Sequence, residues 1–136
     1  MIKIGITGSI ASGKTTASKI LSKKIGPLYS ADKEVKQLYK IRSFQKLLIK
    51  KLSINKKFNL KNSVKKKIIN SKTNFKKLEK IIHPLIRKKM LKFSKKHRNQ
   101  KAIFYEIPLL IESKLKKYFN IIIFIKAKKE LRLKRF

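Results

Sequence analysis

The sequence predicts an α/β fold, a parallel β-sheet flanked by helices, and two observations lead to this prediction. Strand-like runs alternate with helix-like segments along the chain, an order typical of parallel sheets with right-handed crossovers. The chain has 136 residues, 42% of them hydrophobic, which is enough for one domain with a buried core. We therefore expect a single domain over residues 1–136.

The amino-terminal part predicts two strand–helix units in succession. Residues 2–7 alternate in polarity and favour a strand, and residues 15–24 carry apolar side chains at helical spacing. A second short strand is expected at residues 28–30 and a helix at residues 32–39. Functional groups should gather at the carboxyl ends of these strands.

The middle of the chain, from residue 43 to about residue 99, has a helical pattern throughout. Pro84 must begin, break or kink a helix there, because proline donates no backbone hydrogen bond. We expect this stretch, about residues 40–99, to bulge out of the sheet as a helical substrate-binding insert.

The carboxyl-terminal third predicts two more strands. Residues 102–105 form a compact strand-like run that ends at Glu106, and residues 120–125 are a β-branched run suited to a strand buried on both faces. A short helix should join them over residues 109–118. A further helix begins at residue 128.

The charge balance is extreme, with 39 Lys and Arg against six Asp and Glu and a formal net charge of +33. Such a surface attracts phosphates, but two origins stay open: a functional need, or drift from A+T-rich coding. The basic residues are spread along the whole chain. We therefore expect salt-sensitive, non-specific nucleic-acid binding and no specific nucleic-acid partner.

The chain contains no cysteine, so disulfides and thiolate metal sites are excluded for it. The longest uninterrupted apolar run, residues 121–125, is too short to cross a bilayer. We expect a cytoplasmic protein without membrane contact, and the sequence leaves the oligomeric state open.

The strongest motif is Gly8–Thr15, which fits G-x-x-x-x-G-K-[ST] and lies between a predicted strand and helix. Glycines let such a loop wrap its amides around phosphates. Lys14 would reach the β- and γ-phosphates of ATP, and the Thr15 hydroxyl would bind Mg²⁺. The fold class becomes P-loop kinase-like, and the predicted nucleotide-binding residues are Gly8, Ala11, Ser12, Gly13, Lys14, Thr15 and Thr16.

Asp32 is the only aspartate in the chain and follows the second strand. Two roles are open from position alone. It caps the amino terminus of the next helix, or it orients an acceptor hydroxyl and accepts its proton during phosphoryl transfer.

Four further residues have two open roles each. Glu106, at the end of the third strand, holds Mg²⁺ or is a solvated carboxylate, and Glu112 holds the metal or pairs with a lysine. His83 is structural or contacts substrate, and Arg87 binds a substrate phosphate or lies on a solvated helix face.

Taken together, five segments resemble the dephospho-coenzyme A kinase family, in the right order and over essentially the whole chain. They are Ile4–Thr16, Ser30–Asp32, Leu78–Arg87, Glu106–Glu112 and Leu131–Arg135. The resemblance implies transfer of the ATP γ-phosphoryl group to the ribose 3′-hydroxyl of dephospho-CoA, the last step of CoA synthesis, with Mg²⁺ as cofactor.

The resemblance also implies roles for single residues. Asp32 and Lys14 would be catalytic, Asp32, His83 and Arg87 would bind dephospho-CoA, and Thr15 and Glu106 would hold the metal. The insert would receive the pantetheine and adenine. Two alternatives remain: a P-loop kinase for another small acceptor such as a nucleoside, and a non-catalytic basic remnant that binds ATP or nucleic acid.

The chain departs from the family pattern in residues and in length. Ser30 and Glu106 stand where the family has aspartate, and Ser9 and Ala11 replace loop glycines. Family members continue with an arginine-bearing lid, a last strand and a closing helix. We expect these parts to be missing, with an open sheet edge and impaired turnover as consequences.

Overall fold

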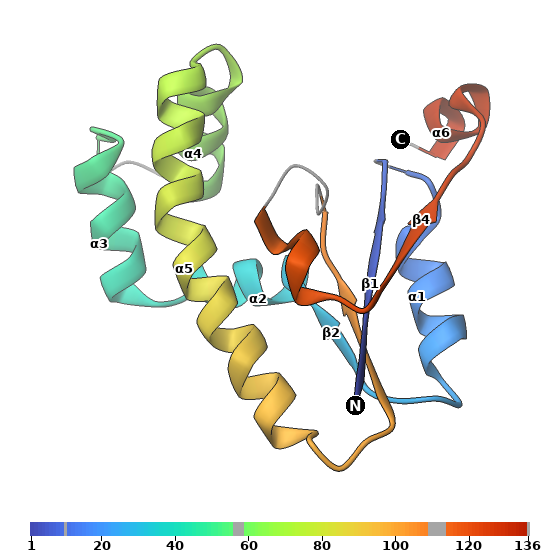
Figure 1. Ribbon diagram of the computed structural model, residues 1–136. Helices are drawn as coiled ribbons and strands as arrows, with labels where there is room; N and C mark the ends of the chain where they lie inside the picture. Colours follow the sequence, from blue (N-terminus) through green and yellow to red (C-terminus); the bar gives the residue numbers. More distant parts are fainter. Residues whose placement is uncertain (10, 56–58, 109–113, 136) are drawn as a thin grey trace. The chain divides into compact units, whose positions relative to one another are not determined.

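The computed structural model describes residues 1–9, 11–55, 59–108 and 114–135 (Figure 1). The strands are β1 (Ile2–Gly8), β2 (Leu28–Ser30), β3 (Ala102–Glu106) and β4 (Ile121–Ile125). The helices are α1 (Lys14–Ser22), α2 (Ala31–Leu38), α3 (Arg42–Lys51), α4 (Leu60–Ile69), α5 (Lys72–Lys96), the 3₁₀ helix η1 (Lys114–Tyr118) and α6 (Lys129–Arg135). No helix within these ranges is both long and apolar enough to span a membrane.

The chain divides into two compact units. The sheet unit comprises Met1–Asp32 and Met90–Phe136, and the helical unit comprises Lys33–Lys89. Each unit is built around its own set of buried side chains, as described next.

The sheet unit contains four parallel strands in the order β2-β3-β1-β4. Ile6 of β1 lies opposite Glu106 of β3, and Glu106 lies opposite Ser30 of β2. This register brings the carboxyl ends of three strands to one edge of the sheet, where the loop after β1 also begins. The predicted α/β class with a parallel sheet flanked by helices is confirmed.

The core of the sheet unit is apolar and aromatic. All five residues of β3 are buried, and Ile6 beside them is fully buried. The Tyr105 ring packs against Tyr29, Phe93 and Tyr118 at centroid distances of 5.5–5.6 Å. Burial raises the pKa of the Tyr105 hydroxyl, and its hydrogen bond with the Tyr118 hydroxyl raises it further. The phenol therefore stays uncharged inside the core.

Strand β4 differs from its prediction. Its partner among the described strands is β1, and its residues are at most half-buried, with Ile121 47% and Phe124 43% exposed. The prediction of burial on both faces is wrong. A β-branched run indicates that a segment forms a strand, but the burial of that strand depends on what packs against its two faces.

The helical unit has its own buried apolar side chains. Phe44 and Leu48 of α3, Val64 of α4 and Ile86 of α5 are buried. An ion pair of 2.8 Å joins Lys89 Nζ to Glu34 Oε2, with each side chain 32% exposed. Such a half-exposed pair contributes little, about 0–1 kcal/mol, so the apolar contacts dominate.

Helix α5 is continuous from Lys72 to Lys96 (Figure 1). Pro84 lies in its interior, which excludes two of the three expected outcomes, a helix start and a break, and leaves a kink as the prediction. Proline removes one hydrogen bond and costs roughly 3 kcal/mol or more in a helix interior. Burial of Leu78, Ile86 and Met90 along one face of α5 offsets that cost.

Candidate active site

The loop that follows β1 needs glycine at two positions. A Cβ atom added at Gly8 would lie 2.6 Å from the Ile125 carbonyl oxygen and 2.8 Å from Ser12 Oγ. Gly13 has φ 88°, in the left-handed region that side chains disfavour. Ala11 also lies there, with φ 59°, at a cost of about 1–2 kcal/mol. Glycine therefore suits positions 8 and 13, whereas Ala11 is held in a backbone conformation that alanine disfavours.

Helix α1 presents a bare amino terminus to this loop. Its cap residue Gly13 makes no side-chain hydrogen bond, and its first turn contains no acidic residue. The first amides of a helix have no carbonyl partners within it, and they carry partial positive charge. Together with the Lys14 ammonium group, they form a site suited to phosphate oxygens.

Ser12 adds a polar atom to the same place. Its side chain is 5% exposed, and its Oγ has no hydrogen-bond partner among the described residues. A buried hydroxyl without a partner costs about 1–3 kcal/mol. A phosphate oxygen in the loop would satisfy it.

A cavity of about 490 Å³ lies over the loop. The described residues that line it are Ser9, Ala11, Ser12, Gly13, Lys14, Thr15, Thr16, Asp32 and Pro108. We call it the P-loop cavity. It brings the carboxylate of Asp32 to the predicted phosphate site, and seven of its lining residues come from the loop and the start of α1.

Asp32 lies inside the first turn of α2, one residue after the helix begins at Ala31. It therefore does not occupy the cap position that one of its two predicted roles requires. The side chain is exposed and lines the P-loop cavity. This placement leaves the carboxylate accessible to a bound acceptor.

The Thr15 hydroxyl donates a hydrogen bond of 2.7 Å to Glu106 Oε1. Glu106 is 2% exposed, so its interpretation as a solvated carboxylate is wrong. The two oxygens fit a Mg²⁺ site, because this ion takes oxygen ligands and commonly uses one or two protein groups together with water and phosphates. The described residues contain no cluster of three or more His, Cys, Asp or Glu that would form a protein-only metal site.

His83 and Arg87 lie four residues apart on α5, in the helical unit. His83 is half-buried and Arg87 is exposed. Neither is among the described residues that line the P-loop cavity. Glu112 lies outside the described residues.

Sequence reasoning missed two features of the cavity. Pro108 lines it, and the signal was available in the Glu-Ile-Pro run after the third strand. The unpartnered hydroxyl of Ser12 had no signal, because burial of a loop serine depends on the packed structure.

The family model described as "Dephospho-CoA kinase" matches residues 2–136. The chain belongs to the dephospho-CoA kinase family. A Rickettsia typhi protein named "Dephospho-CoA kinase" is 39% identical over 135 residues, which cover 99% of this chain and 70% of the relative. A Fusobacterium nucleatum protein of the same name is 34% identical over 136 residues, with 97% and 70% coverage.

A solved structure has the same fold as this dephospho-CoA kinase family member. A crystal structure of a protein from Thermus thermophilus matches with a TM-score of 0.78 and 26% identity, covering 98% of this chain and 70% of the other. The predicted family is therefore confirmed by sequence, and the fold agrees with a known structure.

Proposed function

We propose that this chain transfers the γ-phosphoryl group of ATP to the ribose 3′-hydroxyl of dephospho-CoA, giving CoA and ADP. Membership of the family supports the reaction. The observation that carries it is the P-loop cavity, in which Lys14 and Asp32 line one space beside the Thr15–Glu106 pair. A cytoplasmic location is part of this proposal.

The loop and α1 bind the donor. The amides of the loop, the amino terminus of α1 and the Lys14 ammonium group surround the β- and γ-phosphates. These groups are held in place before the reaction. They therefore stabilise negative charge on the transferring group without reorganisation.

Asp32 acts on the acceptor. Its carboxylate accepts a hydrogen bond from the 3′-hydroxyl and orients the oxygen toward the γ-phosphorus. As the new O–P bond forms, the bond to the bridging β–γ oxygen breaks and ADP leaves. The hydroxyl proton passes to Asp32 and from there to water.

Thr15 and Glu106 are the residues that would hold Mg²⁺. The ion, when bound, supplies positive charge that neutralises the donor phosphates. Glu106 is almost fully buried and accepts the hydrogen bond of the Thr15 hydroxyl, so its carboxylate is held in place.

His83 and Arg87 complete the proposal as acceptor-binding residues of the helical unit. The exposed guanidinium of Arg87 offers two parallel donors to a phosphate. Arg87→Ala should raise KM for dephospho-CoA and leave KM for ATP unchanged. Arg98→Ala, an exposed arginine beyond α5, is the matched control.

The reaction is tested by ADP release in a coupled assay, with dephospho-CoA compared against a panel of nucleosides. We expect turnover with dephospho-CoA and a background rate with each nucleoside. Turnover with nucleosides alone would contradict the proposal and assign the chain to another class of small-molecule kinase.

A further inference from the structure

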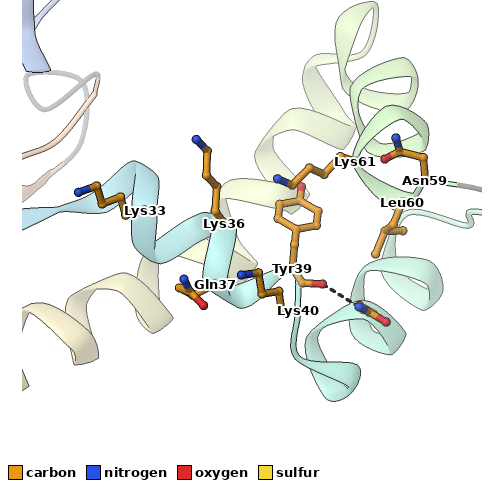
Figure 2. Close-up of a pocket in the computed structure, with 9 residues that line it drawn as sticks. Lys33, Lys36, Gln37, Tyr39, Lys40, Asn59, Leu60 and Lys61 are labelled. Atoms are coloured by element: carbon orange, nitrogen blue, oxygen red, sulfur yellow. Dashed lines mark hydrogen bonds between the residues drawn. The ribbon is translucent and has the colours of Figure 1, made fainter.

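A second cavity lies wholly within the helical unit. Its volume is about 500 Å³, in the range of small-molecule sites. Figure 2 shows the side chains around it, which come from α2, the turn after α2, α3 and the start of α4. The described residues that line it are Lys33, Lys36, Gln37, Tyr39, Lys40, Gln45, Asn59, Leu60 and Lys61. We call it the lysine cavity.

The lysine cavity is strongly positive. Four of its nine lining residues are lysines, and no carboxylate is among them. Of the two acidic residues of α2, Glu34 is paired with Lys89 and Asp32 lines the P-loop cavity. Ammonium groups gathered in one concave space repel one another and concentrate the positive potential. An anion bound there would relieve that repulsion.

The start of α4 adds to this potential. Its cap residue Asn59 makes no side-chain hydrogen bond, and the first turn contains no acidic residue. The amides of Asn62 and Ser63 already donate to the Asn59 carbonyl. The amides before them have no carbonyl partner within the helix, and they belong to Leu60 and Lys61, two of the residues that line the cavity.

An aromatic ring stands in the same cavity. The Tyr39 ring packs edge-on against Phe44 at 5.4 Å between centroids, and Gln45 Nε2 donates a 2.7 Å hydrogen bond to the Tyr39 carbonyl. Lys61 Nζ lies 5.5 Å from the ring centroid (Figure 2). Burial raises the pKa of the Tyr39 hydroxyl, so the phenol stays a hydrogen-bond donor at neutral pH.

We propose that the lysine cavity binds a diphosphate ester, with its phosphates on Lys36, Lys40 and Lys61 and its organic part against Tyr39. Three ammonium groups from separate segments match two linked phosphates better than a single one. The proposal partly rests on the proposed function, because dephospho-CoA is itself a diphosphate ester. The source is therefore the acceptor or a separate compound of the same chemistry.

The site is tested by isothermal titration of inorganic pyrophosphate into the full chain carrying Lys14→Ala, which weakens the competing P-loop cavity. We expect saturable binding with one site. Adding Lys40→Ala and Lys61→Ala should weaken it at least about tenfold. The charge-matched control adds Lys50→Ala and Lys65→Ala, two exposed lysines of α3 and α4 that do not line the cavity, and should change it less than about twofold.

Two results would overturn the site. One is the absence of saturable binding, and the other is an equal loss in the two lysine pairs, which would mean general attraction by the +33 charge. Because all four lysines are solvent-facing, thermal unfolding should be nearly the same in each variant without ligand. That measurement separates loss of binding from loss of folding.

The source of the diphosphate is decided in the chain with Lys14 intact. If KM for dephospho-CoA rises about tenfold in the Lys40→Ala, Lys61→Ala variant while KM for ATP holds, the acceptor supplies it. If both KM values hold while pyrophosphate binding is lost, a separate diphosphate compound occupies the cavity. Turnover of the unsubstituted chain tests the proposed function independently, so its failure is distinguishable from failure of this site.

Discussion

The two cavities that we propose as phosphate sites differ in the charged groups that line them. The P-loop cavity combines Lys14 with a carboxylate, Asp32, and lies beside the buried Glu106. The lysine cavity has more ammonium groups and no carboxylate among its described lining residues. Positive charge alone binds phosphate, whereas transfer also needs a proton acceptor and a metal ligand. In the proposed function, the reactive site is therefore distinguished by its carboxylates and not by the abundant lysines of this chain.

Glycine follows the same division. All four glycines precede residue 27 and so belong to the sheet unit. In the helical unit, Ser53 and Asn59 adopt positive φ without glycine. Ala11 of the sheet unit does the same. Gly8 is required for a different reason, because an added Cβ there would meet a backbone carbonyl.

The largest expected effect comes from removing the proton acceptor. Asp32→Asn should lower kcat about 10²–10⁴-fold, because the amide cannot take the hydroxyl proton. ATP affinity should hold, since Lys14 and the loop are intact. Steady-state ADP release and ATP titration measure the two quantities. The control is Glu79→Gln, which removes a carboxylate of the helical unit and should leave kcat unchanged. A normal kcat in Asp32→Asn would show that the carboxylate of the P-loop cavity is not the proton acceptor.

The next effect concerns the metal. Glu106→Gln keeps the size of the side chain but removes its charge, and it should raise the Mg²⁺ concentration for half-maximal activity about 10–100-fold. Removing the metal with EDTA should abolish turnover of the unsubstituted chain. ADP release is measured across a series of free Mg²⁺ concentrations, with Glu130→Gln of α6 as control. An unchanged Mg²⁺ dependence would exclude Glu106 from the metal site.

The third prediction concerns Gly26, in the turn after α1, and its effect on the free energy of unfolding. A Cβ at position 26 would lie 2.0 Å from the Ala102 carbonyl oxygen, which is backbone and cannot rotate away. Gly26→Ala should therefore lower the free energy of unfolding by about 1–3 kcal/mol, measured by urea denaturation. Ile25→Ala, next to it and 55% exposed, should cost less. Equal stability of Gly26→Ala and the parent would show that the turn is looser than described.

The smallest expected effect comes from removing backbone strain at Ala11 in the loop after β1. Ala11→Gly should raise the free energy of unfolding by roughly 0.5–1 kcal/mol, because φ 59° strains alanine and suits glycine. Ala17→Gly in the interior of α1 is the matched control and should have the opposite sign. If both substitutions destabilise the chain equally, Ala11 is not strained.

Much of the sheet unit could be predicted because its signals are local. The motif Gly8–Thr15 needs only a strand before it and a helix after it, and both were evident from residue spacing. The contact between Thr15 and Glu106 joins residues 91 positions apart and depends on the register of β1 with β3. The P-loop motif and the family resemblance predicted the two residues as metal ligands, while their hydrogen bond could be seen only in the fold.

Other features were beyond local reasoning. The exposure of β4 depends on its place in the strand order, and the passage of α5 through Pro84 depends on burial of neighbouring side chains. The lysine cavity had no sequence signal at all. Lysine is so common in this chain that no sequence pattern distinguishes Lys40 and Lys61 from the other exposed lysines, and only the folded structure shows that these two line a cavity.

The central claim is that the loop after β1 binds the terminal phosphates of a nucleotide through Lys14 and its amides. The most direct measurement is titration of ATP into the chain and into Lys14→Ala, each with and without Mg²⁺. We predict saturable, Mg²⁺-dependent binding that weakens at least about tenfold in the variant, with Lys19→Ala on the same helix as the unaffected control. Equal ATP affinity of the parent chain and Lys14→Ala would contradict the claim.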